Sequence, residues 1–242
     1  MEKSNRFEPI EAAKQFVDSH FPNCQGAILA GSVVRGEATD KSDLDIVIFD
    51  QQFPTSYRES FIEFGWAIEA FVHNKMSYKQ YFENDYKRAR PSLPNMVAEG
   101  IILKDEGIIT NIKREADELL ANGPEKWTLH TIMLKRYFIT DALDDFIGCS
   151  NRAEELFIAN QLAELVSEFV LRTNQQWIGT SKWTVRALKH YDPLFAAHFV
   201  QVFDTYYTDR KKNEIITFVQ DVLKPYGGTL FAGFSLGKSN SN

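Results

Sequence analysis

The pattern of apolar residues changes character once along the chain, and this change limits the folds that the chain can adopt. Before a break at residues 121–124, short apolar runs of strand length alternate with stretches of helical periodicity. After the break, long helical stripes take over, such as the one from Ile139 to Phe146. We therefore predict an α+β fold with two domains. Residues 1–122 form a small mixed β-sheet flanked by helices, and residues 123–242 form an all-α helical bundle.

Within the first domain, the apolar spacing predicts both helices and strands. The predicted elements are a helix over 7–17, strands over 27–30 and 44–48, a helix over 56–64, and strands over 66–72 and 100–103. The prediction of a helix over 56–64 rests on the capping-box spacing of Ser56 and Glu59 and on Gly65, which would end the helix.

Residues suited to phosphate and metal follow the first predicted strand and occupy the second. Gly31 and Ser32 end the first strand, and Asp43 and Asp45 flank Leu44 at the start of the second. A glycine lets the backbone approach a ligand closely, and a serine hydroxyl can donate to a phosphate oxygen. The amides of a helix beginning after the glycine would also favour phosphate. Aspartates two residues apart on a strand point to the same side, so they can share divalent ions that bridge nucleotide phosphates.

A third carboxylate on an apolar strand extends this candidate metal site. Glu69 lies in the middle of the strand over 66–72, where an unpaired buried charge would be unfavourable. Glu63 is the competing residue, but the helix predicted over 56–64 assigns it a solvated position. We therefore predict Asp43, Asp45 and Glu69 as catalytic residues and as the ligands of divalent metal.

Each of these motifs alone is common in turns and loops, and it is their order along the chain that indicates a nucleotide site. In this order, the residues Gly31, Ser32, Asp43, Asp45 and Glu69 resemble the signature of the DNA polymerase beta-like nucleotidyltransferase superfamily. The resemblance covers the first half of the chain, and its first two motifs are the more specific. It implies a nucleotidyltransferase catalytic domain over 1–122 that uses two Mg²⁺ ions and a nucleoside triphosphate.

The helical half resembles, more loosely, the C-terminal domain of bacterial aminoglycoside and lincosamide nucleotidyltransferases. The segments 140–145 and 177–183 carry this similarity. The resemblance implies a substrate-binding domain over 123–242, an acceptor hydroxyl bound between the two domains, and AMP as the transferred group with ATP as its donor. An aminoglycoside-like antibiotic would then be the acceptor, and the protein would act in antibiotic resistance.

Charged residues outside the signature are candidates for binding the two substrates. Arg35 flanks the Gly-Ser loop, and Lys182 and Arg186 lie four residues apart where a helix can begin, so all three could bind the triphosphate. Asp141 and Asp145 cluster on one helix surface, where either could act as general base or bind a cationic acceptor. The alternative for Arg35 is neutralisation of the aspartates, and for the other four it is a solvated surface position.

Charge and hydropathy argue against several other classes of protein. A formal net charge of −6 and a pI near 5.5 disfavour a protein that binds a long nucleic acid. No apolar run approaches the roughly 20 residues that cross a bilayer, and the N-terminus lacks a signal peptide, so we predict a cytoplasmic protein without membrane contact. The cysteines and histidines have no zinc-ligand spacing. The sequence leaves open whether the protein forms a homodimer.

The predicted function is metal-dependent transfer of a nucleoside monophosphate to the hydroxyl of a small molecule, with release of pyrophosphate. Two alternatives remain. A protein-adenylylating member that neutralises a toxin is disfavoured by the helical half, because such members usually consist of one minimal domain. A non-catalytic nucleotide-binding sensor is disfavoured by three carboxylates on apolar strands, which a dead site would hold only at an electrostatic cost.

Overall fold

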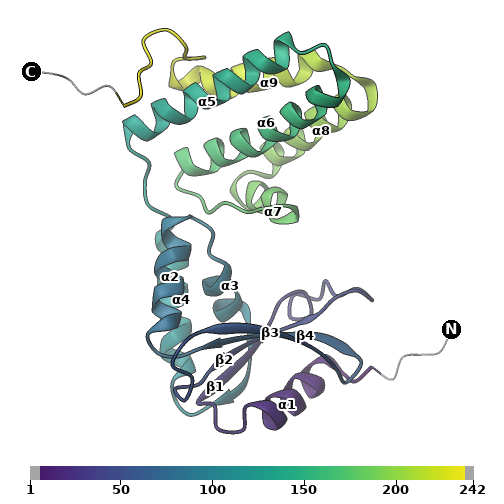
Figure 1. Ribbon diagram of the computed structural model, residues 1–242, viewed down its shortest axis with the longest axis vertical. Helices are drawn as coiled ribbons and strands as arrows, with labels where there is room; N and C mark the ends of the chain where they lie inside the picture. The colour runs from purple at the N-terminus through teal and green to yellow at the C-terminus, as the bar shows by residue number, and fades with distance from the viewer. Residues whose placement is uncertain (1–5, 238–242) are drawn as a thin grey trace, which may run out of the picture. The chain divides into compact units, whose positions relative to one another are not determined.

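A computed structural model of the chain describes residues 6–237. The chain divides into two compact units, Met1–Gly123 and Pro124–Asn242. The first unit holds a mixed five-stranded sheet with flanking helices, and the described residues of the second unit form helices and loops (Figure 1). The predicted α+β fold class is therefore confirmed.

The sheet of the first unit has the strand order β3-β4-β2-β1-β5. Its strands are β1 (Gly26–Ala30), β2 (Leu44–Phe49), β3 (Tyr57–Glu63), β4 (Trp66–His73) and β5 (Ile101–Asp105). β2 and β4 run parallel, whereas the other neighbouring pairs are antiparallel. In the parallel pair, Leu44 and Asp45 at the start of β2 lie beside Ile68 and Glu69 of β4.

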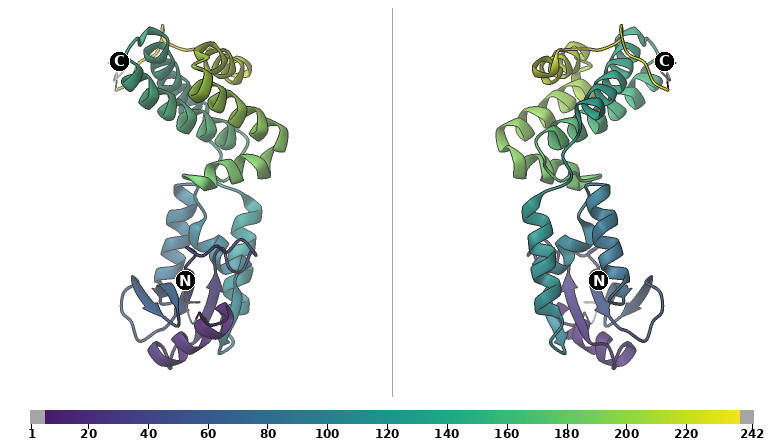
Figure 2. Two further views of the ribbon diagram at one scale, coloured as in Figure 1. Left: turned by 90° about the vertical axis from the view of Figure 1, so that its right-hand side faces the viewer. Right: turned by 90° about the vertical axis from the view of Figure 1, so that its left-hand side faces the viewer.

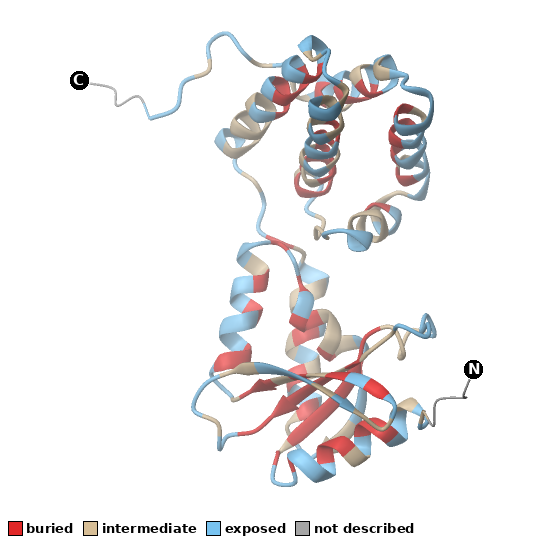
Figure 3. Ribbon diagram, turned by 45° about the vertical axis from the view of Figure 1, so that its right-hand side comes forward, coloured by how far each residue is buried: buried red, intermediate tan, exposed pale blue. Residues whose placement is uncertain are grey.

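Helices cover both faces of this sheet, because its central strands are apolar on both sides. The helices are α1 (Pro9–His20), α2 (Ser77–Lys87), α3 (Ser92–Glu99) and α4 (Ile109–Asn122). On one face Phe16 of α1 packs in a cluster with Ile46, and on the other Ile109 of α4 packs in a cluster with Val47. Figure 3 shows the buried residues concentrated along the strands and on the helix sides turned toward them.

The helix predicted over 56–64 is wrong, since these residues form β3, an edge strand paired with β4. Phe64 and Gly65 connect the two strands with φ angles of 53° and 79°. A two-residue turn with both φ angles positive is typical of a β-hairpin. Tyr57 and Phe61 are four residues apart, a spacing that one face of a strand satisfies as well as one face of a helix. Pairing with β4 selects the strand.

The apolar spacing predicts none of the helices α2, α3 and α4. The first two are short and join at a corner that a buried side chain holds together. The carboxylate of Asp85 accepts a hydrogen bond from the backbone N–H of Leu93 at 2.8 Å and one from Arg88 Nη2 at 2.5 Å. This corner therefore depends on a contact between residues of different helices, which helical periodicity does not report.

The second unit is a bundle of helices, seen from two sides in Figure 2. Its elements are α5 (Leu129–Gly148), α6 (Arg152–Thr173), α7 (Lys182–Tyr191), α8 (Pro193–Asp209), α9 (Lys212–Leu223) and the 3₁₀ turn η1 (Lys224–Tyr226). The side chains of Thr128, Asn151 and Asp192 accept hydrogen bonds at the N-termini of α5, α6 and α8. Within residues 6–237, no helix combines the length and the apolar character needed to cross a bilayer.

Candidate functional site

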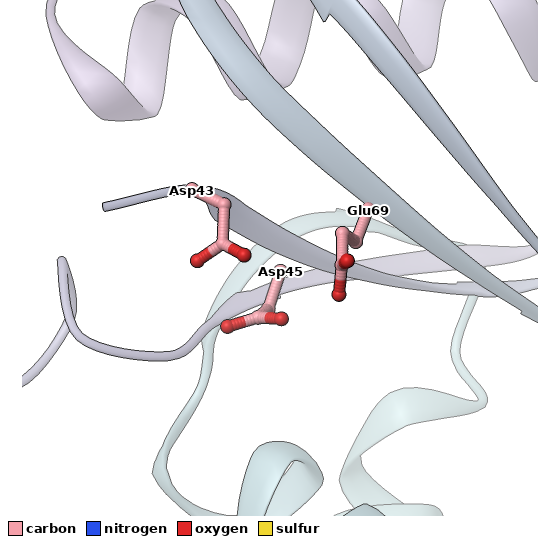
Figure 4. Close-up of side chains that lie close together, drawn as sticks. All are labelled: Asp43, Asp45 and Glu69. Atoms are coloured by element: carbon pink, nitrogen blue, oxygen red, sulfur yellow. The ribbon is translucent and has the colours of Figure 1, made fainter. Parts of the chain in front are cut away.

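Three carboxylates meet where β2 begins. Asp43 immediately precedes β2, Asp45 lies within it, and Glu69 lies directly opposite Asp45 on the parallel strand β4. Each carboxylate offers one oxygen, and these oxygens lie within 4.8 Å of one another. Figure 4 shows the three side chains pointing to the same side. Among the residues that the structure describes, this is the only group of three or more acidic, histidine or cysteine side chains arranged to hold a metal ion.

The negative charge of this cluster is only partly balanced by neighbouring cations. Burial, followed by the negative charges of Asp43 and Glu69, raises the pKa of Asp45 from 3.8 to about 6. The positive charges of Arg35 and Arg58 oppose this rise in pKa. Carboxylate oxygens are the ligands that hard divalent cations such as Mg²⁺ prefer. The donor set and the excess negative charge therefore fit a divalent cation.

Gly31 is required by the close approach of Asp45. Its φ of 85° lies in the left-handed region, and a Cβ atom built on it would lie 2.1 Å from Asp45 Oδ2. The sequence predicts that this glycine lets a ligand approach the backbone closely. In the structure, the neighbour that excludes a side chain is a carboxylate of the cluster.

The loop after Gly31 is held by hydrogen bonds to one serine. Ser32 Oγ donates to Ser42 Oγ at 3.0 Å, and the backbone N–H of Thr39 donates to the same oxygen at 2.8 Å. Arg6 Nη2 donates to the backbone carbonyl of Ser42 at 2.7 Å. The expected helix N-terminus after Gly31 is not formed, because residues 32–36 make consecutive turns instead. Ser42 therefore orders the loop, and it is a residue that the sequence motifs did not single out.

Arg35 is half-buried and joins this loop to α3. Its guanidinium pairs with Glu99 at the C-terminal end of α3, and its Nε donates to Glu37 Oε2 at 3.2 Å. Its charge also lowers the pKa of Asp45. This electrostatic effect agrees with the neutralising alternative for Arg35, and contact with a triphosphate stays a prediction.

Arg58 belongs to the site, although the sequence motifs do not predict it. It lies on β3, and its Nη2 donates to Glu69 Oε2. A helix over 56–64 gives this residue no place in the sheet, whereas the register of β3 and β4 places it on the same sheet face as Glu69. The signal in the sequence that could have indicated strand β3 is the pair Phe64 and Gly65, which forms the hairpin turn between β3 and β4.

Glu63, the competing carboxylate, lies apart from the cluster. It ends β3, and its two carboxylate oxygens are 3.0 and 3.1 Å from His20 Nε2 at the end of α1. The position expected for it was a solvated helix, and that is wrong because the residue is on a strand with a histidine partner. Its absence from the cluster leaves Glu69 as the third carboxylate.

The other predicted residues lie in the second unit. Asp141 and Asp145 occupy exposed positions on α5. Lys182 begins α7, and Arg186 follows one turn later with its guanidinium carbon 4.7 Å from the centroid of the Trp183 ring. The structure thus brings Asp43, Asp45, Glu69 and Gly31 close together within the first unit. The four other candidates belong to the helical bundle: Asp141, Asp145, Lys182 and Arg186. Their roles in substrate binding stay predictions.

Comparison with known proteins agrees with this geometry. Residues 10–93 match the family model described as Nucleotidyltransferase domain, a segment that contains β1 to β4 and the whole carboxylate cluster. This segment is therefore similar to a nucleotidyltransferase domain, and the similarity supports nucleotidyl transfer as the general activity. The match supports the resemblance at the level of the superfamily.

Among solved structures, the chain is similar to a nucleotidyltransferase-like protein from Exiguobacterium sibiricum 255-15. The two share 10% sequence identity with a TM-score of 0.50, over 90% of this chain and 75% of that chain. At this identity the similarity concerns the fold alone. No curated protein matches the chain significantly.

Proposed function

We propose that this protein transfers AMP from ATP to a hydroxyl group of a small-molecule acceptor, with an aminoglycoside-like antibiotic as the acceptor class to test first. The observation that carries the proposal is the cluster of Asp43, Asp45 and Glu69 inside a segment that matches a nucleotidyltransferase domain. Three carboxylates whose charge is only partly balanced are more typical of a functional site than of a structural one. ATP is the donor that the resemblance to antibiotic-modifying enzymes implies.

In this proposal the cluster holds divalent metal and the loop holds phosphate. Asp43 and Asp45 would be metal ligands, with Glu69 as third ligand or as the base that takes the proton of the acceptor hydroxyl. Bound Mg²⁺ would supply positive charge that neutralises the phosphate oxygens. Gly31 and Ser32 would hold the triphosphate, the Ser32 hydroxyl exchanging its hydrogen bond with Ser42 for one to a phosphate oxygen.

The reaction that fits these residues is an in-line displacement. The acceptor oxygen forms a bond to the α-phosphorus, the bond from the α-phosphorus to the bridging oxygen breaks, and pyrophosphate leaves. The acceptor proton passes to Glu69 or to solvent. Most of the rate enhancement would come from placing the two reactants and from balancing charge. In the second unit, Lys182 and Arg186 are proposed to bind phosphate, and Asp141 or Asp145 to bind the acceptor.

The proposal is tested by Mg²⁺-dependent release of pyrophosphate. Each of the four ribonucleoside triphosphates is combined with a panel of aminoglycosides and lincosamides, and mass spectrometry identifies the product. The variants are Asp43→Asn/Asp45→Asn and, as a matched control, Asp18→Asn, which removes a charge from an exposed position on α1.

Release that depends on an acceptor, disappears in the double variant and persists in Asp18→Asn supports the proposal. Nucleotide binding without release on any small acceptor contradicts it. That second outcome would direct attention to a protein acceptor, tested by transfer of radiolabelled nucleotide to proteins, or to a nucleotide sensor.

A further inference from the structure

Arg58 contacts the carboxylate cluster directly through Glu69. It lies opposite Phe71 in the β3–β4 pairing, and its guanidinium carbon is 5.0 Å from the centroid of the Phe71 ring. From there its Nη2 donates to Glu69 Oε2. The aromatic face and the carboxylate together hold the guanidinium beside the cluster.

The two partners of this ion pair differ in their exposure to solvent. The side chain of Arg58 is 57% exposed, whereas that of Glu69 is 23% exposed. Because the Arg58 side chain is largely exposed, water can solvate its guanidinium in other rotamers, which weakens its hold on Glu69. The arginine can therefore leave Glu69 at little cost, while Glu69 stays in place on its strand.

A metal ion at the cluster would change the electrostatic interactions of Arg58. A divalent cation bound to Asp43, Asp45 and Glu69 repels a guanidinium that contacts the same carboxylate. A nucleotide held by that metal would bring phosphate oxygens to the mouth of the cluster, and these oxygens attract a guanidinium strongly. The same positive charge thus opposes binding of the metal alone and favours binding of the nucleotide.

We propose that Arg58 is a positioning residue that serves as the counter-ion of Glu69 in the metal-free protein and turns to the nucleotide phosphates when metal and nucleotide bind. The proposal deepens the proposed function and rests on it. It assigns a role to a residue of the edge strand β3, which is paired with β4, the strand that carries Glu69.

This role predicts that removal of Arg58 shifts two affinities in opposite directions. In Arg58→Gln, the dissociation constant for Mn²⁺ alone should fall on the order of tenfold, as Coulomb's law gives for a unit charge a few ångströms from a divalent ion in a water-like dielectric. The dissociation constant for a non-hydrolysable ATP analogue at saturating Mn²⁺ should rise by a similar factor. Arg58→Lys keeps the charge and should lie close to wild type in both measurements.

Electron paramagnetic resonance of Mn²⁺ and isothermal titration calorimetry of the analogue measure these two quantities without catalysis. Arg114→Gln is the matched control, because it removes an arginine from an exposed ion pair with Glu118 on α4 of the same unit. Both affinities should be unchanged in this control. Asp45→Asn should abolish Mn²⁺ binding and so show that the bound ion occupies the cluster.

The outcomes separate this proposal from the proposed function. If wild type binds Mn²⁺ at the cluster but Arg58→Gln weakens both affinities or changes neither, Arg58 has only a structural role and the inference is overturned. If wild type binds no Mn²⁺, or binds it equally well in Asp45→Asn, the proposed function itself is contradicted and this inference with it.

Discussion

Replacing Asp45 by asparagine tests the electrostatic account of the cluster, because the change removes one negative charge and alters the shape of the side chain little. The pKa of Asp45 rises from 3.8 to about 6 in the folded protein, a shift of about two units. Since each unit corresponds to about 1.4 kcal/mol, the ionised carboxylate destabilises the metal-free protein by about 3 kcal/mol at pH 7. Asp45→Asn should therefore be more stable than wild type by up to about that amount, while losing nucleotidyl transfer.

The dependence of this gain on pH follows from the direction of the shift. Between pH 3.8 and pH 6 the folded protein binds the Asp45 proton more tightly than the unfolded chain does, so the unfavourable contribution grows with pH in this window. It is fully present above pH 6 and absent below pH 3.8. The difference in unfolding free energy between variant and wild type should therefore shrink toward zero as the pH falls from 7 to 4.

Urea denaturation in the presence of EDTA measures this difference at several pH values. Asp18→Asn is again the control, and its stability should stay within about 0.5 kcal/mol of wild type at every pH. A lower stability of Asp45→Asn at pH 7, or a gain that is the same at pH 4 and pH 7, would refute the reasoning. Added Mg²⁺ should stabilise wild type and leave Asp45→Asn unchanged, because the ligand binds only the intact folded site.

Three further substitutions test other parts of the structure. Gly31→Ala should lower the free energy of unfolding by about 1–3 kcal/mol and weaken Mn²⁺ binding, because its Cβ would lie 2.1 Å from Asp45 Oδ2 on a backbone with φ of 85°. Urea denaturation measures the first effect and Mn²⁺ titration the second, and unchanged metal binding would contradict the close approach. Burial lowers the pKa of His73 from 6.5 to about 4, so the roughly 3 kcal/mol that the neutral side chain contributes is lost as the pH falls through this window, while the contribution of Asp45 changes in the opposite direction. In denaturation curves from pH 7 to 4, the stability of wild type relative to His73→Phe should fall by about that amount, and parallel curves would argue against a neutral buried histidine. Tyr206→Phe removes the 2.7 Å hydrogen bond from Tyr206 Oη to Glu155 Oε1 and should cost about 1–2 kcal/mol in the same assay; a neutral effect would show that this bond adds nothing to the bundle.

The components of the site that sequence predicts are those set by local properties of the chain. Asp43 and Asp45 share a side because alternation along a strand is a property of the backbone. Strand β1 followed by Gly31 and Ser32 is likewise local, since the apolar run and the glycine mark where the strand ends. The α+β class follows from the change of periodicity near residues 121–124.

The parts that sequence misassigned depend on how segments of the chain pair with one another. The residues of β3 fit a helix by their own spacing and form a strand because β4 pairs with them, so the helix prediction left Arg58 unconnected to the site. After Gly31 the chain makes turns closed by its own backbone hydrogen bonds instead of a helix, and Ser32 and Thr39 donate to Ser42 across the loop.

By itself, the sequence determined which residue types this protein has for metal and phosphate and the order in which they follow the strands, because residue identity and strand alternation are local. The sequence also favoured Glu69 over Glu63, but only the tertiary structure placed Glu69 directly opposite Asp45 and brought Arg58 into contact with Glu69. The first depends on the register between the parallel strands β2 and β4, which packing on both faces of the sheet selects, and the second on the hairpin that joins β3 to β4.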